Sequence, residues 1–100
     1  MMLLVCFDLP RYSGEERRQA TKFQKRLVSL GFSMKQFSLY ERPIRQSSSI
    51  KKIVNIISRE LPDTGAITMY TLPNEIHNKQ ITILGENANK IIAKPKLLIF

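Results

Sequence analysis

Apolar and polar residues divide the chain into segments with distinct periods. Residues 2–7 are apolar without interruption, which predicts a central β-strand covered on both faces. The Asp-Leu-Pro sequence at residues 8–10 closes this run and predicts a turn. Residues 66–72, introduced by Gly65, are apolar on both phases and predict a second interior strand.

Two segments show the period of amphipathic helices. The first begins at Ser13, which with Glu16 predicts a capping box, and it ends at Gly31. The second begins in the serine cluster at residues 47–49 and ends before Pro62. The apolar stripes are Ala20, Phe23, Leu27 and Leu30 in the first helix and Ile50, Ile53, Val54, Ile57 and Leu61 in the second.

The segment from Phe32 to Glu41 is strand-like, but its apolar phase changes partway. Apolar residues stand at even positions before Gln36 and at odd positions after it. Because strand side chains alternate with a period of two, this change requires a bulge, a twist or a tight hairpin near Gln36.

The order of these segments predicts a ferredoxin-like βαββαβ sandwich of the α+β class, with an antiparallel sheet and both helices on one face. Residues 81–84 predict a further short strand, and the apolar tail at residues 97–100 predicts another. A bare apolar strand is a hazard unless it pairs, so we expect the tail to pair with a second copy. We thus expect one domain over residues 1–100, with a core at about 1–84 and a C-terminal loop and dimer-pairing strand at 85–100.

The net charge of +8 lies in one half of the chain. Residues 11–52 hold eleven Lys and Arg residues against three acids, a surplus of eight, which predicts a polyanionic partner. An anionic membrane surface is the competing interpretation, and a solvated helix face is the simplest one. The candidate phosphate-binding residues are Arg11, Arg17, Arg18, Lys22, Lys25, Arg26, Lys35, Arg42 and Arg45. Phe7, Phe23, Phe32 and Phe37 fall on apolar phases and are expected in the core, which favours duplex backbone contact over stacking with single strands.

Asp8 is the only acid of the first strand and stands at its end. Its carboxylate either braces the turn through bonds to nearby amides or binds an ion. If a two-fold axis passes close by, two copies of Asp8 can share a divalent cation such as Mg²⁺, which makes this residue the candidate metal ligand and catalytic residue. One acid per chain is limited support for catalysis.

The remaining reactive side chains give little reason to expect a site. Cys6, the only cysteine, lies in an apolar run, so we expect an inert packed thiol and a cytoplasmic protein. His77 has no neighbouring Cys or His and is expected at the surface. The apolar start is too short for a signal peptide, and no other run approaches transmembrane length, so no membrane segment is expected.

Three segments, LLVCFDLP, ERRQATKFQKRL and LGFSMKQFSLYERPI, together resemble the second family of CRISPR-associated spacer-acquisition proteins, the small non-integrase partner. The matching residues are a strand-end aspartate, a helix arginine, a glycine and a Q-x-S-x-aromatic-E run, here Asp8, Arg18, Gly31, Gln36, Ser38 and Glu41. The resemblance implies a ferredoxin-like homodimer that bridges two integrase dimers and supports double-stranded DNA. It also implies a dimer interface that includes Gln36, Ser38, Leu97, Leu98, Ile99 and Phe100.

The resemblance also implies a second activity, because many relatives are described as magnesium-dependent endonucleases that act on RNA or DNA. In that alternative, the aspartates corresponding to Asp8 hold the metal in the dimer. Where many relatives have a second acid shortly afterwards, this chain has Pro10 and Arg11, so its metal site is poorer in carboxylates. The ferredoxin-like fold hosts many functions, and a small regulatory or toxin-like protein that binds a metabolite or mRNA is a third hypothesis.

Overall fold

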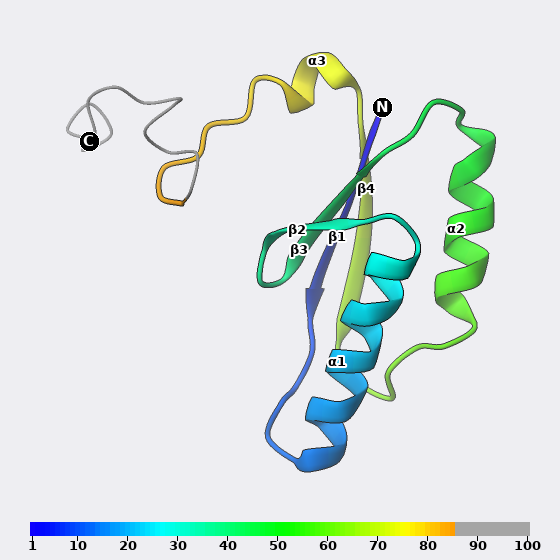
Figure 1. Cartoon of the computed structure of the whole chain (residues 1–100), viewed down its shortest axis with the longest axis vertical. Coiled ribbons are helices and arrows are strands. Elements are labelled where there is room, and N and C mark those ends of the chain that lie inside the picture. The colour runs from blue at the N-terminus through cyan, green and yellow to red at the C-terminus, as the bar shows by residue number, and fades with distance from the viewer. Residues whose placement is uncertain (86–100) are drawn as a thin grey trace.

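The structure is a computed structural model that describes residues 1–85, and its elements follow the order βαββαβ with one short helix added (Figure 1). The strands pair antiparallel in the order β2-β3-β1-β4. This order confirms the predicted ferredoxin-like fold. The elements are β1 (Met2–Asp8), α1 (Gly14–Ser29), β2 (Ser33–Gln36), β3 (Leu39–Pro43), α2 (Ser48–Ser58), β4 (Ala66–Leu72) and α3 (Asn74–His77).

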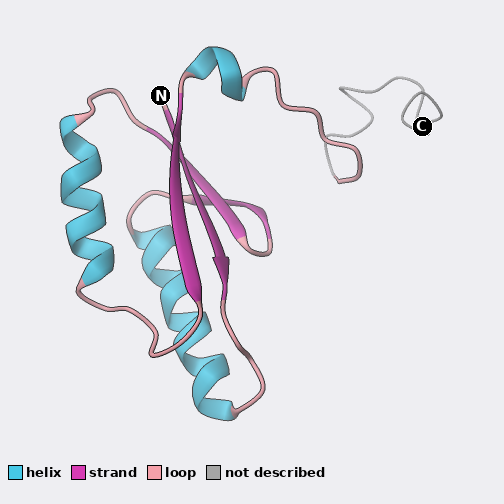
Figure 2. Ribbon diagram, turned by 180° about the vertical axis from the view of Figure 1, so that it is seen from behind, coloured by secondary structure: helices cyan, strands magenta, loops and turns pink. Residues whose placement is uncertain are grey.

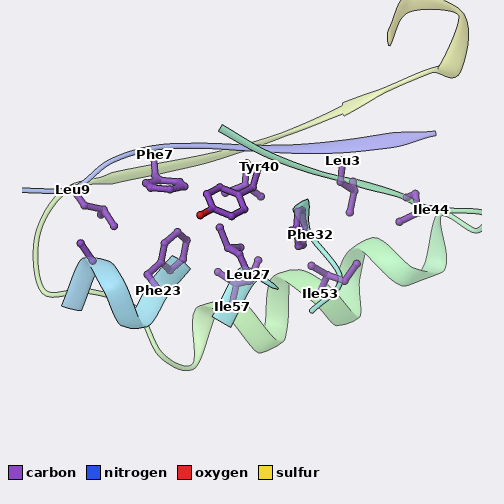
Figure 3. Packing of buried hydrophobic residues seen from close by; sticks show 12 residues of the cluster. Leu3, Phe7, Leu9, Phe23, Leu27, Phe32, Tyr40, Ile44, Ile53 and Ile57 are labelled. Carbon is purple, nitrogen blue, oxygen red and sulfur yellow. The ribbon is translucent and has the colours of Figure 1, made fainter. Parts of the chain in front are cut away.

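Helices α1 and α2 lie on the same face of the sheet (Figure 2), and the core fills the space between them and β1 (Figure 3). Phe7 of β1 contacts Phe23 of α1 edge to face, with ring centroids 5.3 Å apart. Alternate residues of β1 are buried on this side, whereas Leu4 and Cys6 are half-buried on the opposite side. The prediction that β1 is covered on both faces is therefore wrong for residues 1–85, because both long helices cross over to the same side. We call the opposite side the open face.

The start and end of α1 follow the sequence signals. The Ser13 side chain accepts a hydrogen bond from the Glu16 amide at 3.1 Å, and the Glu16 carboxylate accepts one from the Ser13 amide at 2.8 Å. The helix ends before Gly31, whose φ of 90° suits a residue without a Cβ. Helix α2 is shorter than its apolar stripe, so Leu61 lies beyond it and is exposed. Among the described residues, no helix is long and apolar enough to cross a bilayer.

The phase change near Gln36 is a tight hairpin with a bulge. β2 and β3 are joined by the two-residue turn Phe37–Ser38, and their register shifts between Met34 and Gln36. The prediction that Phe37 belongs to the core is wrong, because its position in the turn leaves 80% of its surface exposed. A turn residue does not follow the alternation of the strands that it joins.

The second predicted interior strand, β4, lies at an edge. Within residues 1–85 it pairs with β1 alone, and Tyr70 is exposed. The strand predicted at residues 81–84 does not form, because Pro73 and α3 turn the chain away after β4 and these residues have no neighbouring strand to pair with in the described part. The predicted pairing strand at residues 97–100 lies outside the described residues.

Candidate nucleic-acid interface

Helix α1 gathers the basic residues on its side away from the sheet. Ala20, Phe23 and Leu27 face the core, so the side chains between them point outward. A shallow hollow of about 550 Å³ runs along this outer side. We call its lining the α1 track, which consists of Gly14, Arg17, Arg18, Thr21, Lys22 and Lys25. The fold thus brings four of the nine candidate phosphate-binding residues together.

Some of these cations already have partners within the chain. The Arg18 guanidinium contacts both carboxylate oxygens of Glu15, at 2.7 and 2.8 Å. Hydrogen bonds from Arg18 and then from Gln19 lower the pKa of the Glu15 carboxyl, and the same pair raises the pKa of Arg18. Arg26 lies 3.8 Å from Glu60, and its buried Nε makes no hydrogen bond within residues 1–85. Arg17 donates hydrogen bonds to two backbone carbonyls, whereas Lys22 and Lys25 are exposed track cations with neither a hydrogen bond nor an ion pair in the described part.

The other candidate cations are dispersed. Arg42 packs its side chain against Gly31, at the turn between α1 and β2. Lys35 is half-buried on the edge strand β2. Arg45 and Arg11 are exposed at opposite ends of the sheet, because the first follows β3 beside the start of β1 and the second follows the end of β1. The structure therefore does not place all nine residues on one surface of a single chain.

Asp8 ends β1 at a closely packed point of the sheet. It pairs in register with Ala66 of β4, and the amide of Phe7 donates a hydrogen bond to the carbonyl of Ser38 at 3.0 Å. A Cβ on Gly65 would lie 2.7 Å from the Asp8 carbonyl oxygen, so only glycine fits there. The Asp8 side chain is exposed and makes no hydrogen bond within residues 1–85, so the expectation that it braces the turn is not met in the described part.

A single copy of residues 1–85 does not provide a metal centre. No three His, Cys, Asp or Glu side chains of this part gather closely enough to hold an ion. Mg²⁺ is held through carboxylates and water, and Asp8 supplies one carboxylate per chain. A second copy of the chain would add the second carboxylate of the shared site that the sequence predicts.

Two features of this region were missed by sequence reasoning. Tyr12 projects from the β1–α1 loop with 93% of its surface exposed. The only sequence signal is that this aromatic residue stands between Arg11 and Ser13, outside any apolar period.

His77 is the second missed feature, since the expectation of a surface histidine is wrong. Its Nε2 lies 2.9 Å from a carboxylate oxygen of Glu41, and the His77 side chain is only 14% exposed. Glu41 points to the open face of β3, and α3 returns over that face after β4. No local pattern shows this contact, because 36 residues separate the two partners.

Gln36 and Ser38, two residues of the predicted dimer interface, are exposed. Gln36 ends β2 and Ser38 lies in the following turn, next to the end of β1. The other four predicted interface residues, Leu97, Leu98, Ile99 and Phe100, lie outside the described residues. The interface therefore stays a prediction.

Comparison with known proteins gives a consistent result. The sequence model of the family "CRISPR associated protein Cas2" matches residues 1–94. The CRISPR-associated endoribonuclease Cas2 of Streptococcus mutans serotype c is 31% identical over 100 residues, which are all of this chain and 92% of the relative. The protein of the same description from Ligilactobacillus salivarius is 32% identical over 91 residues, covering 91% of this chain and 90% of the relative.

A solved structure shares the fold. The crystal structure of Streptococcus pyogenes Cas2 at pH 6.5 superposes with a TM-score of 0.68 and 23% identity, covering 85% of this chain and 100% of that one. The family match spans nearly the whole sequence and includes the segments that carry the strand-end aspartate and the basic helix. The chain therefore belongs to the CRISPR-associated protein Cas2 family.

Proposed function

We propose that this chain is a CRISPR adaptation protein that works as a homodimer, bridges two integrase dimers and holds the backbone of double-stranded DNA during spacer acquisition. The observation that carries the proposal is the α1 track, where exposed cations follow one side of a helix. Phosphate contacts give affinity without sequence preference, because each neutralised phosphate releases condensed counterions.

The α1 track has dimensions suited to a nucleic-acid backbone. Arg18, Lys22 and Lys25 are spaced at helical intervals, so their side chains form one row. Seven residues of helix at a rise of about 1.5 Å span about 10 Å, which is the length of about three base steps at 3.4 Å. One chain thus offers a short row of contacts, and two chains extend it along the duplex.

Two uncovered features of a single chain, the edge of β4 and apolar side chains of the open face, support pairing with a second copy. The backbone of β4 has a free edge within the described residues, and unpaired strand edges attract further strands. Beyond the hollow that α3 lines, the open face carries the half-buried Cys6 and the exposed Tyr70, whose apolar surface gains from being covered. We propose that the second copy covers this face and that the tail at residues 97–100 pairs with the partner.

Salt dependence and molecular mass test this proposal. Binding of a mixed-sequence duplex can be measured by fluorescence anisotropy between 50 and 300 mM salt. The slope of log binding constant against log salt concentration should be about −0.9 per phosphate contacted. Light scattering should give twice the mass of the chain, and the tagged protein should retain a CRISPR integrase from extract. A flat salt response, a strong preference for one sequence, or a stable monomer contradicts the proposal.

A second candidate function is Mg²⁺-dependent cleavage of RNA or DNA by two Asp8 carboxylates, one from each copy. It is favoured by the relatives from S. mutans and L. salivarius, which are described as endoribonucleases. Within residues 1–85 of one chain no three potential ligands gather, so the Asp8 of a second copy would supply the second carboxylate.

Substitution of Asp8 tests the second function. Cleavage of a labelled single-stranded RNA with Mg²⁺ should disappear in Asp8→Ala and with EDTA, and it should persist in the control Glu75→Gln, which removes a distant exposed acid. Cleavage by Asp8→Ala at the wild-type rate excludes this function, and the test leaves the DNA-binding proposal unaffected.

A further inference from the structure

Tyr12 is an exposed aromatic side chain on a firmly held backbone. The Arg17 guanidinium donates hydrogen bonds to the carbonyls of Arg11 and Tyr12, both at 3.3 Å. The capping box begins at the next residue, Ser13, and Pro10 fixes the backbone two residues earlier. The ring therefore extends from a hydrogen-bonded loop and has 93% of its surface exposed.

The surroundings of Tyr12 indicate the chemistry of that ligand. Tyr12 lines a hollow of about 580 Å³ together with Asp8, Arg11 and Gly65, at the end of β1. Arg11 is exposed and lines the same hollow, and the α1 track begins directly after the loop. A free aromatic face next to an exposed guanidinium suits a nucleotide, because the ring stacks on the base and the cation contacts the phosphate.

We propose that Tyr12 stacks on an unpaired nucleobase and that the hollow at the end of β1 holds one nucleotide of a single strand, with Arg11 at its phosphate. This inference rests on the proposed function only in taking a nucleic acid as the partner. Within a duplex both faces of a base are covered by its neighbours, so a stacking side chain requires an unpaired base. Single-stranded RNA, single-stranded DNA and the unpaired end of a duplex offer the same chemistry.

The proposal separates two modes of contact on adjacent surfaces. The α1 track takes backbone phosphates and has no aromatic side chain among its residues, whereas the hollow has an aromatic ring and one exposed cation. Loss of the ring should therefore weaken binding of single strands and leave duplex binding unchanged. Loss of track cations should weaken both.

Binding of three matched probes tests the proposal. The probes are a 12-nucleotide single strand, an abasic strand with the same number of phosphates, and a blunt duplex, with the first made as RNA and as DNA to identify the source of the base. Stacking of one base adds about 5- to 140-fold in affinity. Tyr12→Ala should therefore bind the single strand more weakly than the wild type by that factor. Its affinity for the duplex and for the abasic strand should change less than twofold. Tyr12→Phe keeps the ring and should bind as the wild type does.

Fluorescence gives a direct readout of stacking. The chain contains no tryptophan, so Tyr12→Trp introduces the only one. Its emission should fall when the base-containing strand binds and stay unchanged with the abasic strand.

The outcomes separate this inference from the proposed function. If Tyr12→Ala binds single strands as tightly as the wild type, or if Tyr12→Phe loses as much as Tyr12→Ala, stacking is refuted. Duplex binding with a steep salt slope then still supports the proposed function. If the protein binds none of the probes, both proposals fail.

Discussion

Removing the Glu15 carboxylate should strengthen duplex binding. Glu15 holds the Arg18 guanidinium through two oxygens, at 2.7 and 2.8 Å, and both side chains are more than half exposed. In Glu15→Gln the charge of that partner is removed, and Arg18 becomes available to a phosphate. An exposed pair contributes little to folding, so the variant should unfold at nearly the same denaturant concentration.

The size of the effect follows from counterion release. One additional phosphate contact steepens the slope of log binding constant against log salt concentration by about 0.9. On going from 1 M to 0.1 M salt, the affinity of the variant should therefore rise about eightfold more than that of the wild type. If two chains contact the same duplex, the slope steepens by about 1.8 and the gain is about sixtyfold.

The assay is duplex anisotropy over a range of salt, with Glu75→Gln as the control. The control removes the same charge from exposed helix α3, away from the α1 track, so it separates release of Arg18 from the change in net charge. An unchanged slope in Glu15→Gln, or an equal change in both variants, would refute the reasoning. The pKa of Glu15 is lowered in the folded chain, so the pair is intact at neutral pH and is lost as pH falls through that lowered pKa. Between pH 6 and 8 the wild-type slope should therefore not change through this group.

Three further predictions concern stability and are checked by urea unfolding. Phe23→Ala should cost about 3–5 kcal/mol, because it leaves a cavity beneath Phe7, 5.3 Å away between ring centroids; a cost below 1 kcal/mol would contradict the packing. Ser13→Ala should cost about 1 kcal/mol through loss of the capping box, and Ser13→Asp should restore most of it. Gly65→Ala should cost about 1–3 kcal/mol, because φ is 112° and the new Cβ would clash with the Asp8 carbonyl; an unchanged midpoint would show that the strand end yields easily.

The parts of the fold that depend on neighbouring residues could be predicted from the sequence. Ser13 and Glu16 are three residues apart and form the predicted capping box, and Gly31 ends the helix with a positive φ. The hairpin at Gln36 followed from a phase change in the apolar pattern. Each of these features is decided within a few residues, so the local sequence contains the necessary information.

Features decided by the packing of distant segments could not be predicted in this way. Apolar residues on both phases made β4 resemble an interior strand, yet the pattern does not show whether a neighbour comes from the same chain or from another. Phe37 matched an apolar phase but lies in a turn. At the candidate site, sequence reasoning found the cations of α1 but missed the free ring of Tyr12, because its exposure depends on how the loop is held by Arg17.

The contact between His77 and Glu41 restricts where a second sheet can approach. It holds α3 across the end of the open face at which β1 begins, where Ile76 and His77 line one hollow with Leu4. That end is sterically occupied by the chain's own residues, while the end at Asp8 is clear of α3 (Figure 1). In the proposed dimer, a second sheet that packs on the open face should therefore lie toward the end of β1 that carries Asp8.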